Sequence, residues 1–295
     1  IILLKISLIG IKTLMKIKLG LGYAGYCFSK ANHVVKGDSS DQIKFHALFG
    51  LLHHPDKGWI LFDTGYTTRF YDATKTYPNK IYADATKVVV CQENEIKAQL
   101  HTLGLKTSDV KHIIISHFHA DHIGGMKDFN DAVFYCTKSA YLDLTNTSDF
   151  LAFSKGILKD LLPENLADRI IFIEDFSSAI SDVIFGVKFD LFNDGSILVY
   201  NLPGHAAGQI GIELKTKKGT YFLVADSCWD KRAYQQAMLP NPIVRLFFDS
   251  WKDYKESLAK LSRYHDQFPE VLIVPTHCSK TTHNMVFKQI NMDVL

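Results

Sequence analysis

The sequence has few of the features that mark a secreted, membrane-spanning or nucleic-acid-binding protein. Only 5 of its 295 residues are cysteine, without the spacing of a disulfide framework, which favours a reducing compartment. Lys and Arg (33) exceed Asp and Glu (31) by only two, so no basic surface for a polyanion is indicated. The apolar run 1–14 contains Lys5 and Lys12 and is too short to span a bilayer. We therefore expect a cytoplasmic protein that binds a small molecule, with no nucleic acid partner and no stable membrane insertion.

Two common enzyme signatures are absent or incomplete. The G-x-S-x-G motif of many serine hydrolases does not occur. Residues 20–25 match G-x-G-x-x-G, but no clear amphipathic helix follows, and no acidic residue ends a second strand at the distance that a dinucleotide site requires. The sequence therefore favours neither a serine hydrolase nor a dinucleotide-binding enzyme.

The chain does contain a dense cluster of metal-binding residue types. Residues 117–122 follow the pattern H-x-H-x-D-H and supply His117, His119, Asp121 and His122. The apolar run 112–115 predicts a buried strand, and an extended chain beyond it would point His117 and His119 to the same side. Asp121 and His122 are adjacent and diverge, so they could serve a second ion. A solvated histidine-rich loop is the alternative explanation for this cluster.

Three more candidates follow predicted strands further along the chain. His205 comes after the apolar strand 197–200, Asp226 closes the strand 221–225, and His277 follows the strand 271–274. Open α/β sheets collect their functional loops at the carboxyl ends of strands. Taken singly, each histidine could be a hydrogen-bonded structural residue, and the aspartate could cap a helix.

In this order and setting, the candidates resemble the dinuclear ligand set of the metallo-β-lactamase-fold hydrolases. The resemblance runs from about Lys16 to His277 and includes the Asp-Thr-Gly element at 63–65. It implies an α/β fold, a four-layer αβ/βα sandwich, formed by a single domain over residues 15–295. Residues 1–14 are expected to be an N-terminal extension.

The resemblance also implies a role for each residue of the set. The first metal would be held by His117, His119 and His205. The second would be held by Asp121, His122 and His277. Asp226 would bridge the two metals.

The chemistry implied is hydrolysis by a water that two adjacent cations make nucleophilic, as a hydroxide bridging the metals. Asp121 could also take the proton of that water and pass it to the leaving group. Asp63 either accepts a hydrogen bond from a ligand imidazole or simply stabilises its turn. Imidazole and carboxylate ligands suit two divalent metal ions, which we expect to be zinc, with iron, manganese or cobalt as alternatives. Cys228 and Cys278 lie beside predicted ligands and could join the site or be buried apolar residues.

The resemblance also indicates which branch of the family this chain is most similar to. The penicillin-degrading branches generally lack an aspartate at the position of Asp226. The redox-active di-iron branch tends to carry a carboxylate at the position of His119, so a histidine there favours hydrolysis. His205 follows His122 by 83 positions, which is longer than usual for glyoxalase-II-like thioesterases. This long insertion resembles the N-acyl-homoserine lactonase-like branch.

The insertion and its neighbours are candidates for substrate contact. We predict a helical insertion near 141–165, with an apolar face that could roof an acyl pocket or merely pack on the sheet. Residues 238–248 could form a second wall or a plain loop before a helix near 251–265. Phe118 and Trp229 are expected to contact the substrate. Trp229 stands where the lactonase-like branch commonly has a tyrosine, and an indole can donate one hydrogen bond but cannot accept or ionise.

The sequence therefore predicts a metal-dependent hydrolase that cleaves a small ester or lactone, with an acyl lactone as the first expectation. A thioesterase or a phosphodiesterase of the same fold is an alternative. A further alternative is a metal-bearing sensor that binds a signalling molecule and turns over poorly. Whether the chain forms a homodimer stays open.

Overall fold

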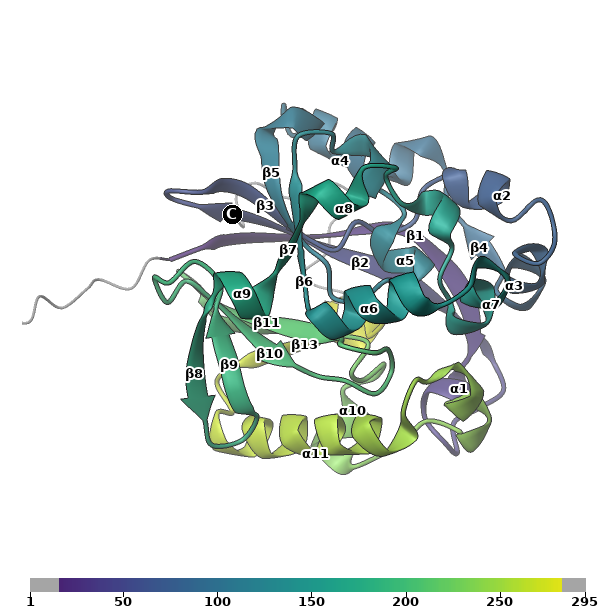
Figure 1. Ribbon diagram of the computed structural model, residues 1–295. Helices are drawn as coiled ribbons and strands as arrows, with labels where there is room; N and C mark the ends of the chain where they lie inside the picture. The colour runs from purple at the N-terminus through teal and green to yellow at the C-terminus, as the bar shows by residue number, and fades with distance from the viewer. Residues whose placement is uncertain (1–15, 283–295) are drawn as a thin grey trace, which may run out of the picture.

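Two β-sheets pack face to face in the computed structural model, which describes residues 16–282 (Figure 1). The first sheet has seven strands. In spatial order they are β4 (Val88–Val89), β1 (Lys18–Lys30), β2 (Gln42–His54), β3 (Gly58–Phe62), β5 (Val110–Ile114), β6 (Val133–Cys136) and β7 (Ile170–Phe172). The second sheet has six strands. Their order is β13 (Leu272–Pro275), β12 (Gly219–Ala225), β11 (Ile210–Thr216), β10 (Ile197–Asn201), β9 (Gly186–Asp190) and β8 (Ser178–Asp182).

The interior between the sheets is apolar because alternate residues of each strand point inward. In β2, Leu48 and Leu52 join the core between the sheets. Phe49 and Leu51 point to the opposite face of the sheet and join a separate hydrophobic cluster that includes Ile96 of α4 (Ile96–Thr102). The facing strands of the second sheet contribute Ile197 and Val199 among others. The two inner faces therefore form one hydrophobic layer.

Helices cover the outer faces of both sheets. Figure 1 shows α4 (Ile96–Thr102) and α8 (Leu166–Arg169) over the first sheet, and α10 (Arg232–Gln236) and α11 (Trp251–Gln267) over the second. In α11, Leu258 and Leu261 are buried in the core. This helix confirms the one expected near 251–265. The order helix, sheet, sheet, helix is the four-layer sandwich that the sequence predicted.

Short helices and 3₁₀ turns connect the strands of the first sheet and lead into the second. They are α1 (Ala31–Val34), α2 (Arg69–Ala73), α3 (Lys80–Ala85), α5 (Ala120–Ile123), α9 (Ile173–Phe176) and the 3₁₀ turns η1 (Gln92–Asn94), η2 (Thr107–Asp109) and η3 (Met126–Asp128). The last described element is α12 (Ser279–Thr282).

The glycine motif at 20–25 lies inside β1, so it forms no loop between a strand and a helix. A Cβ atom on Gly22 would come within 2.3 Å of the Phe49 ring on the neighbouring strand. Gly25 has φ +79° at the irregularity in the pairing of β1 with β2. Close packing and a bulge explain these glycines, which agrees with the rejection of a dinucleotide site.

The insertion near 141–165 is helical but is not one helix. It consists of α6 (Lys138–Asn146), α7 (Asp149–Ala152), η4 (Phe153–Lys155) and η5 (Lys159–Leu161). Helix α6 ends at Asn146, and the extended backbone of the next residue, Thr147, breaks the run; Gly156 has φ +76°, which ends the next turn. The single apolar face expected from the periodicity is therefore divided. Phe150 is 71% exposed, whereas Leu158 is fully buried.

Three expectations concern features outside the sheets. The extension over residues 1–14 lies outside the described residues. Within 16–282, no helix has the length and apolar character needed to cross a membrane. All five cysteines fall in the described part of the chain and none of them is in a disulfide.

Candidate metal centre

The candidate ligands converge because their strands end at the same edge of the sandwich. β10 and β12 both run antiparallel to β11, and β13 runs parallel to β12, so the three strands point the same way. Their carboxyl ends lead to His205, Asp226 and His277. The loop after β5 in the other sheet carries residues 117–122.

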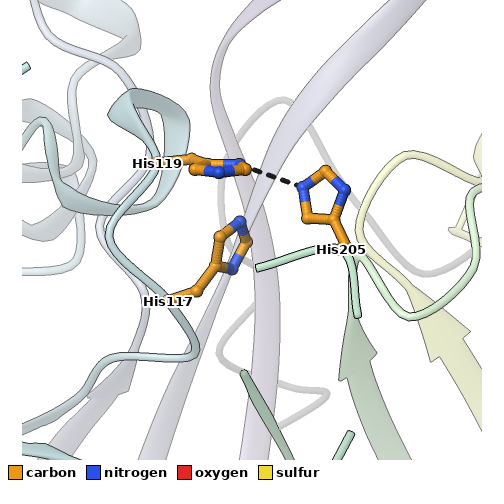
Figure 2. Close-up of side chains that lie close together, drawn as sticks. All are labelled: His117, His119 and His205. Carbon is orange, nitrogen blue, oxygen red and sulfur yellow. Dashed lines mark hydrogen bonds between the residues drawn. The ribbon is translucent and has the colours of Figure 1, made fainter. Parts of the chain in front are cut away.

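The first group consists of His117, His119 and His205. Figure 2 shows their three rings turned toward one another from the two sheets. His119 Nδ1 lies 2.9 Å from His205 Nε2, and one nitrogen of each ring lies within 4.8 Å of the others. His119 is held from behind by Gly156, since a Cβ atom there would lie 3.0 Å from the His119 ring.

The second group consists of Asp121, His122, Asp226 and His277, whose ligand atoms also lie within 4.8 Å of one another. His277 Nε2 is 3.1 Å from Asp226 Oδ2 and 3.5 Å from Asp121 Oδ2. His122 Nε2 is 3.4 Å from Asp121 Oδ2. Asp121 and His122 are presented by the first turn of α5, with His119 as the residue before the helix.

Asp226 connects the two groups through a single oxygen. Its Oδ2 lies 3.1 Å from His277 Nε2 in the second group and 3.2 Å from His205 Nε2 in the first. The neighbouring Ala225 has φ +47°, so the chain turns sharply as it leaves β12 and carries the carboxylate inward. The structure thus brings all seven predicted side chains into two adjoining groups.

Hydrogen bonds fix the outer nitrogens of the imidazoles. His122 Nδ1 donates to Asp63 Oδ2 at 2.7 Å, and Asp63 also accepts from the Ser116 backbone N–H at 2.8 Å. His277 Nδ1 donates to the carbonyl of His46 at 2.8 Å. These bonds orient the Nε2 atoms of His122 and His277 toward the second group.

The Asp-Thr-Gly element also holds the backbone of the motif loop. The Thr64 hydroxyl donates to the carbonyl of His122 at 2.9 Å. A Cβ atom on Gly124 would lie 2.5 Å from the carbonyl oxygen of Gly65. Only glycine permits this approach, which explains the glycines after the cluster.

Burial separates the protonation states of the two groups. It lowers the pKa of His117 well below the usual value, that of His119 to about 4 and that of His205 to about 3. In the second group burial acts in the same direction on His122, but the Asp121 and Asp63 carboxylates outweigh it and raise its pKa. The first group therefore offers neutral imidazoles at pH 7.

Several buried polar atoms of the site have no hydrogen-bond partner among the described residues. They include His117 Nε2 in the first group, and His122 Nε2 and Asp226 Oδ1 in the second. A buried acceptor without a partner costs free energy, and a cation would satisfy each of these lone pairs. The donor set, imidazole nitrogens and carboxylate oxygens, fits two divalent transition-metal ions.

Comparison with known families agrees with this geometry. Residues 47–266 match the model of the metallo-beta-lactamase superfamily, which is more than half of the chain. The chain belongs to this superfamily. Membership confirms the predicted fold and the predicted enzyme class, a metal-dependent hydrolase.

The curated relatives point to one branch of the superfamily. The N-acyl homoserine lactonase AttM of Azorhizobium caulinodans is 27% identical over 214 residues, covering 72% of this chain and 74% of that protein. An N-acyl homoserine lactonase of Bacillus cereus is 24% identical over 181 residues, covering 61% of this chain and 63% of that protein. The predicted similarity to the lactonase-like branch is confirmed.

Solved structures of the superfamily share the fold. An N-acyl homoserine lactone hydrolase with the product N-hexanoyl-L-homoserine at its catalytic metal centre superposes with a TM-score of 0.70 at 18% identity. That match covers 94% of this chain and 99% of the other. The dizinc quorum-quenching lactonase AidC gives a TM-score of 0.59 at 17% identity, covering 90% and 88% of the two chains.

A cavity of about 660 Å³ opens beside the two ligand groups. Asp121, Asp226 and His277 line its inner end, together with Trp229. Most of its other walls are apolar: they include Phe28, Phe45, Ile81, Phe153, Val244, Leu246 and Phe247. Phe153 of the insertion and the turn η6 (Pro242–Phe247) thus both line the cavity. Of the two alternatives for residues 238–248, the structure therefore agrees with a cavity wall and not with a plain loop.

The remaining predicted contacts lie at different depths. Phe118 is buried and lines a smaller cavity of about 160 Å³, which shares His119 and His205 with the larger one. Cys228 and Cys278 are buried, and neither belongs to a potential ligand group among the described residues. Cys278 accepts a hydrogen bond from the Lys231 backbone N–H at 3.4 Å. Both cysteines therefore behave as buried structural residues.

Sequence reasoning missed several participants. Ser116 donates its hydroxyl to Asp63 at 2.7 Å, and the backbone carbonyl of His46 orients His277. Ser116 stands next to the motif and could have been noticed from its position. The His46 carbonyl could not, because a main-chain acceptor carries no mark in the side-chain pattern.

Proposed function

We propose that this chain is a dinuclear metal-dependent hydrolase that opens an acyl lactone. The observation that carries the proposal is the meeting of seven ligand-type side chains, six of them buried, in two groups that share one oxygen of Asp226. His117, His119 and His205 would hold one ion, and Asp121, His122 and His277 would hold the other. Asp226 would belong to both. We take zinc as the expected metal.

Bound there, two divalent ions would supply an activated water near neutral pH and would polarise the ester carbonyl. The protein's own residues prepare this chemistry. Asp63 and the His46 carbonyl keep the ring nitrogens of His122 and His277 oriented. Asp121 is a carboxylate, since His122 and His277 offset the effect of burial and lower its pKa to about 2. It can accept the proton of the attacking water and deliver it to the leaving oxygen.

The cavity supports a substrate with an apolar tail. Its inner end carries the polar site residues, while side chains such as Phe28, Ile81 and Phe247 make its outer walls apolar. An acyl chain would displace water from these walls, which contributes to binding in proportion to the buried area. The ring face of Trp229 would contact the substrate at the inner end, and Phe118 would support His119 from the smaller cavity. The names of the curated relatives, N-acyl homoserine lactonases, support the choice of a lactone.

Proton release during hydrolysis tests the proposal directly. We would chelate the protein, reload it with zinc, and measure proton release with short- and long-chain N-acyl lactones, an aryl ester, a thioester and a phosphodiester. We expect the zinc-loaded protein to hydrolyse acyl lactones fastest and the chelated protein to be inactive. Hydrolysis of the phosphodiester alone would refute the substrate class. Metal-dependent lactone binding without turnover would identify a sensor instead.

A further inference from the structure

We propose that Trp229 is a positioning residue whose indole N–H holds the Asp226 carboxylate in the orientation that lets one oxygen serve both ligand groups. This inference rests on the proposed function, because it assigns Trp229 a part in building the dinuclear site. It differs from the sequence expectation, in which Trp229 would stand in for a tyrosine that contacts the substrate.

The contact is direct and buried. Trp229 Nε1 lies 3.2 Å from Asp226 Oδ2, and both residues are less than 10% exposed. The same oxygen lies 3.1 Å from His277 Nε2 and 3.2 Å from His205 Nε2. Trp229 therefore touches the one atom that belongs to both groups.

Packing leaves the indole little freedom to turn away. The Trp229 ring meets Phe45 edge to face, with centroids 5.5 Å apart, and lies 5.2 Å from the ring of Phe248. Phe45 in turn stacks on His277 at 4.1 Å with an interplanar angle of 14°. On the other side, Trp229 meets His205 edge to face at 5.6 Å. The indole is thus wedged between elements that carry one histidine of each group.

The chemistry of the indole suits a fixed support for an anionic ligand. Its N–H can only donate, so it cannot compete with Asp226 for a cation or change its protonation in the working pH range. A hydrogen bond to a ligating carboxylate restricts the rotation of that carboxylate, which otherwise has to be frozen when the ion binds. A donor already used by Asp226 is also not available to a substrate carbonyl.

Metal titration of three variants tests this assignment without relying on activity. Trp229→Phe removes the N–H and the pyrrole part of the ring. Replacement of Trp229 by benzothienylalanine keeps the size of the ring and places sulfur where the N–H was. Trp251→Phe is the matched control, since Trp251 packs on Phe248 at 5.4 Å and makes no contact with Asp226. Each chelated protein is titrated with Zn²⁺ against a competing chelator, and the Co²⁺ forms are compared by absorption spectroscopy.

We expect both Trp229 replacements to weaken Zn²⁺ binding by about 10- to 100-fold, the usual effect of losing a partner that orients a ligand. The visible spectrum of their Co²⁺ forms should change, while Trp251→Phe should match the wild type in both measurements. Wild-type affinity and spectrum in the benzothienylalanine protein would overturn the inference. If the wild type itself binds fewer than two ions, the proposed dinuclear function fails as well, so the two failures are distinguishable.

Discussion

The two groups of site residues differ in charge although they share a carboxylate oxygen. The first is made of three imidazoles that burial keeps neutral, with the pKa of His119 lowered to about 4 and that of His205 to about 3. The second contains the carboxylates of Asp121 and Asp226. A divalent cation is stabilised more by two buried carboxylates than by neutral nitrogens alone. We therefore expect the second group to bind its ion more tightly, and the first to depend on Asp226 for its only negative charge.

Replacing the shared carboxylate should weaken both groups and produce the largest effect. Asp226→Asn keeps the shape of the side chain but removes the charge seen by both groups. We expect both ions to be lost at micromolar zinc and kcat/KM for an acyl lactone to fall by more than about 100-fold, beyond the usual effect of an outer partner. Metal content and steady-state kinetics measure this. Retention of two tightly bound ions would show that Asp226 is not shared.

Asp63→Asn should sharpen the comparison by weakening the second group more than the first. Asp63 bonds directly to His122 of the second group, whereas it reaches the first group only through Ser116, whose hydroxyl lies 3.0 Å from His117 Nδ1. We expect about 10- to 100-fold weaker zinc binding in one of the two steps of a titration. Asp194→Asn is a matched control, because Asp194 pairs with the buried His54 at 2.9 Å outside both groups. Equal weakening of both steps would show that Asp63 does not act mainly on the second group.

Gly156→Ala should disturb the first group with a smaller effect. The new Cβ atom would lie 3.0 Å from the ring of His119, so the ring would shift by a few tenths of an ångström. We expect roughly tenfold weaker binding in the other titration step, since small misplacements at a site are costly. Gly37→Ala is the control that distinguishes the contact with His119 from backbone strain. Gly37 also has a positive φ (+95°), but no atom lies within 4 Å of its Cβ position. A similar loss in both variants would assign the effect to strain.

How far the sequence allowed prediction depends on whether a feature is set by local or by distant contacts. Period-two alternation and short apolar runs predicted β5, β10, β12 and β13, and the residues after them, because the residues of a strand themselves determine which of its faces is hydrophobic. The site residues at these strand ends could be found for the same reason. The long amphipathic pattern of α11 was equally local.

Interactions between distant segments could not be predicted in this way. The apolar spacing near 141–165 predicted one helix, but the extended Thr147 and the positive φ of Gly156 divide it. The use of the His46 carbonyl by His277 follows from strand order in three dimensions, and the bond from the Trp229 N–H to Asp226 depends on the packing of the indole against Phe45 and Phe248. Side-chain types along the chain do not encode these pairings.

The smallest effect on the site is expected from a carboxylate that already has positive partners. Burial would raise the pKa of Asp230, but hydrogen bonds from Arg232 at 2.9 Å and Lys280 at 3.2 Å outweigh it and lower the pKa to about 2. A pKa lowered by folding stabilises the folded state above the unfolded pKa, near 4, and this contribution disappears as the pH falls toward 2. We expect Asp230→Asn to leave zinc binding unchanged and to lower the free energy of unfolding by about 2 kcal/mol at pH 7. Urea unfolding of the chelated proteins should show this gap narrowing between about pH 5 and pH 3, with the exposed Asp72→Asn as control. A gap that stays constant with pH would mean that the loss comes from packing rather than from charge.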